Sequence, residues 1–233
     1  MKIFLLSFFL LISNIATDPS KMLIIYFTRT GNTEKFANYI KEVINIESYK
    51  IETMTAYPDN YNDMLDLAQQ EINNNARPEI KNPLTDISKY DTLLVGYPLW
   101  YGHLPNIVIN QLEKLDLKGK TIYPFNTHGS SGIGNSINDM KSAANQATVK
   151  EGFPISQSNI QNKDSSIEQI RKWVNNNKFQ SNSDQANDSK TNIVTDTNNS
   201  TVNETFDVFT NRTSNYSMIK ISYLLYFILN ILL

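Results

Sequence analysis

The feature that most constrains this 233-residue sequence is an apolar run that passes almost directly into a helical pattern. Residues 22–27 are continuously apolar, which predicts a buried strand of a parallel sheet. From Glu34 to Ile44, apolar residues recur on one face of a helix. A strand that turns straight into a helix directs the first N–H groups of that helix into the turn, at the positive end of the helix dipole. The turn is therefore a candidate anion site.

The turn itself, residues 28–33, has the sequence Thr-Arg-Thr-Gly-Asn-Thr. Its hydroxyl and amide side chains add hydrogen-bond donors to the N-terminus of the helix, and Gly31 lets the backbone approach a bound anion closely. This chemistry favours a phosphate dianion as the ligand. The alternative is an ordinary helix start that is capped by Thr or Asn.

Strand and helix patterns alternate along residues 22–178. After the first pair, the expected strands are residues 49–53, 91–97, 120–126 and 148–155. The expected helices are residues 61–72, 106–115, 136–147 and 165–174, the last with a capping-box start. Pro124 is unfavourable within a central strand, so the ends of that strand are less well defined. Five strands alternating with five helices predict an α/β fold, a three-layer doubly wound parallel sheet that binds its ligand beyond the carboxyl ends of the strands.

The N-terminal residues differ in composition from this region. Residues 1–16 combine a positive start at Lys2 with a short, mostly apolar run and end in the small residue Ala16. This pattern is typical of a cleaved signal peptide. The alternative is a leader that stays as a membrane anchor, although the apolar run is short for that role.

The C-terminal residues predict a linker and a hydrophobic tail. Residues 179–217 are mostly Asn, Ser, Thr and Asp and contain six N-glycosylation sequons, which predicts a solvated and glycosylated linker, although such a composition also produces sequons by chance. Residues 218–233 are largely apolar and predict either a membrane anchor or a GPI-attachment signal. We therefore expect a protein of the secretory pathway that is extracytoplasmic or at the cell surface and attached to the membrane.

Charge and cysteine content exclude several classes of function. Residues 22–178 contain 16 Lys and Arg against 17 Asp and Glu, a net charge of −1, so no basic surface for nucleic acid is expected. The chain has no cysteine, which excludes thiol catalysis and cysteine-bound metals. With only His103 and His128 available, a histidine-based metal site is also unfavourable, and His103 is assigned no chemistry.

Two further loops carry unusual residues, and each follows an expected strand. Residues 98–102, Pro-Leu-Trp-Tyr-Gly, contain two adjacent aromatic rings that are suited to stacking on a flat ring; the alternative is that Trp100 covers the edge of the core. Residues 127–132, Thr-His-Gly-Ser-Ser-Gly, supply backbone N–H groups that can donate to an electron-rich ring edge. His128 could hold charge on a reduced ring or merely cap its strand.

These three loops resemble those of the flavodoxin-like family. Residues 28–33 match the flavodoxin phosphate loop, (S/T)-x-T-G-x-T, at every fixed position, and residues 96–102 and 124–132 resemble the other two flavin loops. The resemblance covers residues 22 to about 177 and implies a short-chain flavodoxin fold with strand order 2-1-3-4-5 and flavin mononucleotide (FMN) as cofactor. The cofactor-binding residues that it implies are Thr28, Arg29, Thr30, Gly31, Asn32, Thr33, Pro98, Leu99, Trp100, Tyr101, Gly102, Thr127, His128, Gly129, Ser130, Ser131 and Gly132.

The resemblance implies an electron-transfer flavoprotein with an unidentified redox partner protein or small acceptor. Two alternatives remain, an NAD(P)H-dependent quinone or flavin reductase and a surface protein of this fold that has lost its flavin. The sequence departs from typical flavodoxins in two respects, because its folded region is nearly neutral and because it carries export signals.

Overall fold

The computed structural model describes residues 17–179. The predicted signal peptide, the hydrophobic tail and all of the predicted linker except Phe179 lie outside the described residues. Within residues 17–179, no helix is both long enough and apolar enough to cross a membrane.

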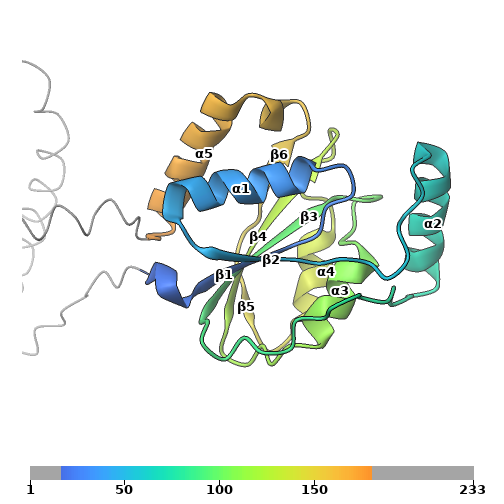
Figure 1. The fold of residues 1–233 in the computed structure, drawn as a ribbon, viewed down its shortest axis with the longest axis horizontal. Coiled ribbons are helices and arrows are strands. Elements are labelled where there is room, and N and C mark those ends of the chain that lie inside the picture. The colour runs from blue at the N-terminus through green and yellow to red at the C-terminus, as the bar shows by residue number, and fades with distance from the viewer. Residues whose placement is uncertain (1–16, 180–233) are drawn as a thin grey trace, which may run out of the picture. The chain divides into compact units, whose positions relative to one another are not determined.

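A parallel sheet with the strand order β2-β1-β3-β4-β5 forms the centre of the described region (Figure 1). A sixth strand, β6, pairs with β4 beyond the end of β5. The strands are β1 (Met22–Tyr26), β2 (Glu47–Lys50), β3 (Thr92–Pro98), β4 (Thr121–His128), β5 (Thr148–Val149) and β6 (Phe153–Ser156). The predicted fold class and strand order are confirmed.

Helices cover both faces of this sheet. Helices α1 (Asn32–Ile44) and α5 (Lys163–Asn176) pack on one face, and α2 (Tyr61–Asn73), α3 (Asn106–Glu113) and α4 (Ser136–Ala143) pack on the other (Figure 1). Two short 3₁₀ helices, Pro19–Lys21 and Asn159–Gln161, lie outside this pattern. Successive side chains of β1 enter the two cores in turn, so all five residues of that strand are buried. This explains its continuous apolar sequence.

The fifth predicted strand, residues 148–155, is divided into β5 and β6. The Lys150 N–H donates to the carbonyl oxygen of Ile122 at 2.9 Å. Successive residues of a strand direct their backbone hydrogen-bonding groups to opposite neighbouring strands, so the backbone groups of Pro124, like those of Ile122, point to the side of β4 on which β5 lies. Proline has no N–H to donate to a neighbouring strand. The interruption between β5 and β6 therefore lies opposite Pro124, which cannot donate a backbone hydrogen bond to that side of β4.

Several other predicted element boundaries were wrong; the fourth helix, for example, was expected at residues 136–147 but ends at Ala143. The second strand was expected at residues 49–53 but ends at Lys50, because the chain beyond it pairs instead with the segment around Ile80. The capping box at residues 165–168 is not formed, because α5 begins two residues earlier and its N-cap is Asn162, whose side chain accepts from the Ser165 N–H.

Candidate functional site

Three loops meet at the carboxyl edge of the sheet because β1, β3 and β4 are neighbours in it. The Phe27 N–H donates to the carbonyl oxygen of Gly96 at 2.9 Å, and the Leu99 N–H donates to that of Thr127 at 2.9 Å. The structure thus brings together residues 28–33, 98–102 and 127–132, the three segments that the sequence singled out.

The first loop leads directly into α1, with Gly31 as the N-cap residue. Gly31 has φ of +85°, a left-handed conformation that glycine adopts without steric cost. The Thr28 hydroxyl accepts the Gly31 N–H at 3.0 Å, which closes the turn, and Thr30 is exposed beside it. The first N–H groups of the 13-residue α1 therefore open onto this loop.

Thr33 and Asn32 each contact a residue outside this loop. Thr33 is buried, and its hydroxyl oxygen lies 2.9 Å from that of Thr127. The Asn32 side-chain oxygen accepts from Gln161 at 3.0 Å, and Gln161 in turn accepts from the Lys35 ammonium group. The segment after β6, which contains Gln161, is thus a fourth segment at the candidate phosphate site, in addition to the three loops.

Arg29 ties the first loop to the segment that precedes α2. Its guanidinium donates to the carbonyl oxygens of Pro58, at 3.1 Å from Nε and 2.5 Å from Nη2, and of Asp59, at 2.7 Å from Nη2. Among the residues that the structure describes, neither Arg29 nor Lys35 forms an ion pair with a carboxylate. Two cationic side chains without carboxylate partners therefore flank the loop, and this favours an anionic ligand.

The second loop places its two aromatic residues very differently. Trp100 is only 7% exposed and packs edge-on against Phe27, with ring centroids 5.5 Å apart, and against Tyr57, at 4.9 Å. Trp100 thus packs against the core, as in the alternative given for it, because the chain before α2 brings Tyr57 against its ring. Tyr101, by contrast, is 48% exposed. The role of either ring in stacking on a flavin stays a prediction.

The second loop turns sharply at Tyr101 and Gly102, whose φ angles are +50° and +79°. Backbone hydrogen bonds between Trp100 and His103, at 2.8 and 3.2 Å, close this turn on both sides. Two successive positive φ angles are typical of a type I′ turn. Gly102 suits this conformation, whereas the bulky Tyr101 adopts it at a steric cost.

Two buried polar atoms without a partner lie at the end of β4, where the third loop begins. Asn126 Oδ1 and His128 Nδ1 are the two buried side-chain atoms in residues 17–179 that have no hydrogen-bond partner. The side-chain NH₂ of Asn126 donates to the carbonyl oxygen of Gly132 at 2.8 Å, which fixes the orientation of its amide. Burial lowers the pKa of the His128 imidazole. Because buried polar atoms are nearly always paired in native proteins, these two indicate a missing ligand or water.

The remaining predicted residues of this loop follow His128. Gly129, Ser130 and Ser131 are exposed, and Gly132 has φ of +63°. Within residues 17–179, no cluster of three His, Cys, Asp or Glu side chains could hold a metal ion.

Comparison with known proteins identifies the family. Residues 21–177 match the family model for flavodoxins. The chain belongs to the flavodoxin family. No curated protein matches this flavodoxin.

Solved structures share the fold of this flavodoxin. A protein from Bacteroides eggerthii DSM 20697 that is described as a flavoprotein is 30% identical, with a TM-score of 0.60 over 69% of this chain and 99% of that one. A second, from Bacteroides uniformis ATCC 8492, is 26% identical, with a TM-score of 0.59 over 67% and 98%. A flavoprotein from Lactobacillus acidophilus NCFM, solved in complex with FMN, is 23% identical, with a TM-score of 0.51 over 65% and 99%.

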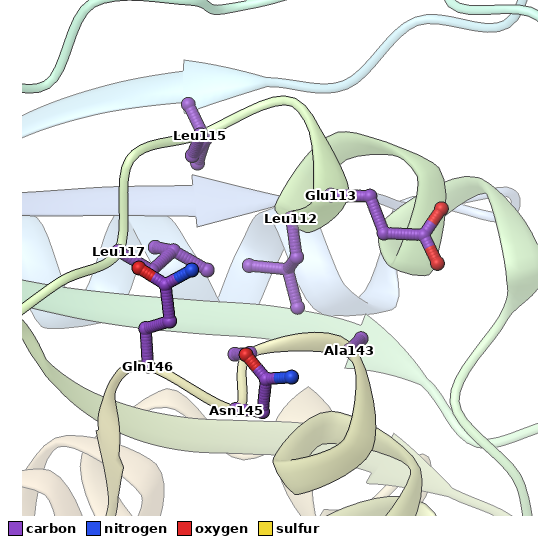
Figure 2. A pocket seen from close by; sticks show the side chains of 8 residues that line it. Leu112, Glu113, Leu115, Leu117, Ala143, Asn145 and Gln146 are labelled. Carbon is purple, nitrogen blue, oxygen red and sulfur yellow. The ribbon is translucent and has the colours of Figure 1, made fainter.

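A hollow elsewhere on this flavodoxin is unrelated to the three loops. It lies between the C-terminal ends of α3 and α4 and the segment that leads into β4, at the opposite, amino edge of the sheet (Figure 2). Leu112, Leu115 and Leu117 form its apolar floor, and the Glu113 carboxylate at its rim is paired with Arg77 at 2.7 Å.

Sequence reasoning missed several residues at the carboxyl edge of this flavodoxin. They are Tyr57, Asn126, Asp139 and Gln161. The Tyr-Pro pair at residues 57–58 predicts only the end of a strand, and Asn126 lies in the segment 124–132 that resembles a flavin loop but is not among the cofactor-binding residues that the resemblance implies. A polar residue at the carboxyl end of a central strand was the one local signal that could have identified Asn126.

Proposed function

We propose that this flavodoxin binds FMN at the carboxyl edge of its sheet and transfers electrons through the flavin. The observation that carries the proposal is the position of the two unpaired buried atoms, Asn126 Oδ1 and His128 Nδ1, on the strand whose Thr127 contacts the phosphate loop. A flavin ring edge has both N–H donors and carbonyl acceptors, so it can satisfy such atoms. The FMN complex of the Lactobacillus acidophilus flavoprotein, which shares the fold, supports the same cofactor.

The residues of the site fit the two ends of FMN. Thr28, Thr30 and the N-terminus of α1 would hold the phosphate, with Arg29 and Lys35 adding positive charge. The loops after β3 and β4 would hold the ring. FMN supplies the redox chemistry when bound, and the protein controls its orientation and surroundings. The apolar Trp100, Phe27 and Tyr57 exclude water and disfavour net negative charge beside them.

An FMN titration tests this proposal. We expect the purified full-length chain to show flavin absorbance bands and, after removal of the flavin, to quench FMN fluorescence at micromolar concentration. Riboflavin, which lacks the phosphate, should bind more weakly because it cannot use the loop at residues 28–33. A colourless protein that leaves FMN fluorescence unchanged would indicate a flavodoxin fold that has lost its flavin.

Steady-state kinetics distinguish a carrier from a reductase. If the protein is a simple electron carrier, it should not oxidise NADH or NADPH in the presence of a quinone without a separate reductase. Sustained oxidation would instead assign the NAD(P)H-dependent reductase activity.

We further propose that the protein is exported and attached to the membrane. The proposal rests on the composition of residues 1–16 and 180–233, and on the pairing of Thr17, whose N–H donates to the carbonyl oxygen of Lys178 at 3.1 Å. Cleavage after Ala16 would leave this pair intact. N-terminal sequencing of the protein from its native cell should begin at Thr17, glycosidase treatment should lower its apparent mass, and deletion of residues 218–233 should release it from membranes. An N-terminus at Met1 in a soluble fraction would contradict export.

A further inference from the structure

We propose that Asp139 is a positioning residue that holds the aromatic turn, residues 100–103, in place beside the flavin site. The purpose of this positioning rests on the proposed FMN function. The contacts themselves connect two segments that the sequence does not relate, the turn after β3 and the first helical turn of α4.

The Asp139 carboxylate contacts one backbone N–H group and two side chains. Its Oδ2 accepts the Leu104 N–H at 3.0 Å and lies 3.0 Å from His103 Nδ1. Its Oδ1 accepts from the Asn135 side-chain amide at 3.0 Å. The carboxylate is 18% exposed, so these contacts are partly shielded from water. Hydrogen bonds to an ionised acceptor are stronger than those between neutral groups.

A second contact holds the same turn from the side of α4. The Asn135 N–H donates to the carbonyl oxygen of Gly102 at 2.7 Å. A Cβ atom at Gly134 would lie 2.4 Å from that oxygen, so the two loops are in direct contact. Asp139 orients Asn135 through its side chain and therefore supports this contact as well.

The turn needs such support because its conformation is strained. Tyr101 has φ of +50°, a conformation that is unfavourable for a bulky side chain and persists only where the surroundings impose it. Two of the carboxylate contacts, those with His103 and Leu104, lie directly after the strained pair. Loss of these contacts would let the turn relax and would move Trp100 from its packed position.

A role of Asp139 in holding the turn must be distinguished from a role in stabilising α4 alone. Asp139 also lies in the first turn of α4, where a negative charge stabilises any helix through its dipole. Asp164 also lies in the first turn of its helix, α5, is exposed and has no side-chain hydrogen bond among the described residues. Asp164→Asn therefore removes the same charge from the same kind of helix position and is the matched control.

The tryptophans provide a local readout. The chain has two, and Trp173→Phe leaves Trp100 as the single tryptophan, which is excited selectively at wavelengths where tyrosine does not absorb. In this background we compare the full-length wild-type chain, Asp139→Asn and Asp164→Asn, first without flavin, by emission wavelength and acrylamide quenching, and then by FMN titration.

We expect Asp139→Asn to shift Trp100 emission to longer wavelength, to increase its quenching and to raise the Kd for FMN about tenfold, since an amide cannot accept all three contacts. Asp164→Asn should change neither property. Unchanged Trp100 emission and FMN affinity in Asp139→Asn, with FMN bound normally by the wild-type chain, would overturn the inference while leaving the proposed function in place.

Two further outcomes are also decisive. If the wild-type chain does not bind FMN, the proposed function fails, and the shift in Trp100 emission alone decides whether Asp139 holds the turn. If Asp139→Asn does not fold, His103→Gln replaces it, because it keeps the carboxylate and alters one contact in a half-exposed loop residue. A smaller shift in the same direction is then expected, and an unchanged emission spectrum overturns the inference.

Discussion

The hydroxyl oxygens of Thr33 and Thr127 lie 2.9 Å apart, and both side chains are buried. This contact joins the first turn of α1 to the end of β4, two segments separated by 94 residues in the sequence. The last threonine of the phosphate-loop motif is therefore part of the link between two of the three loops, in addition to being a candidate phosphate ligand.

Thr30 and Thr33 should respond differently to substitution by alanine. Thr30 is exposed, so Thr30→Ala should weaken FMN binding by about 1 kcal/mol, which is roughly fivefold, and leave the free energy of unfolding unchanged. Thr33→Ala leaves the buried Thr127 hydroxyl without its partner and should lower the free energy of unfolding by about 1–3 kcal/mol. FMN titration and urea denaturation measure the two effects. Equal stability of both variants would show that the Thr33 contact is unimportant.

Arg29 should contribute both charge and attachment. Arg29→Met removes a cation beside the phosphate loop and its contacts with Pro58 and Asp59. We expect weaker FMN binding, with a loss that shrinks at high salt because part of it is electrostatic, and faster amide exchange before α2. The control is Arg171→Met, which makes the same charge change at an exposed position of α5. A loss independent of salt would assign Arg29 to attachment alone.

Gly96 should tolerate no side chain. A Cβ atom there would lie 2.2 Å from the ring of Phe125, which is packed edge-on against Phe36. Gly96→Ala should therefore lower the free energy of unfolding by about 1–3 kcal/mol through overpacking. At Gly129 a Cβ atom meets nothing within 4 Å, so Gly129→Ala should change stability by less than about 0.5 kcal/mol. Urea denaturation measures both, and a Gly96→Ala variant as stable as wild type would mean that Phe125 can move aside.

Glu71 should make stability depend on pH. Burial raises the pKa of this carboxyl, which accepts from the Tyr57 hydroxyl at 3.0 Å. A raised pKa in the folded state means that stability is fully present below the ordinary value of 4.5 and falls as the pH rises through the folded value. Glu71→Gln stays neutral and keeps an acceptor for Tyr57, so its stability relative to wild type should increase with pH.

Urea denaturation of both proteins on either side of that range tests this expectation. Glu79→Gln, at an exposed position, is the control and should show no such trend. A constant difference between Glu71→Gln and wild type at all pH values would contradict the prediction.

The positions of the regular elements were largely predictable, because they follow from local patterns. The apolar run at residues 22–27 became β1, shortened by one residue, and the helical pattern before Ile44 became α1. The ends were less predictable. Whether β2 continues beyond Lys50 depends on a distant segment around Ile80, and the interruption between β5 and β6 depends on Pro124 in another strand.

The candidate site was predictable as three loops but not as a set of contacts. Trp100 lies against the core because Tyr57 and Phe27 reach it from other segments, and no local pattern carries that information. Asp139 and Gln161 were missed for the same reason, since each contacts its loop across many residues of sequence.

The sequence by itself determined the alternation of strands and helices, the glycine that opens α1 and the hydroxyl-rich turn before it, because periodicity and backbone preference act over a few residues. Only the tertiary structure decided which of those side chains are already engaged, as Thr33 and Trp100 are, and which polar atoms still lack a partner, as Asn126 and His128 do. The physical reason is that burial and hydrogen bonding of a side chain depend on neighbours brought in by the fold, and those neighbours are distant in the chain.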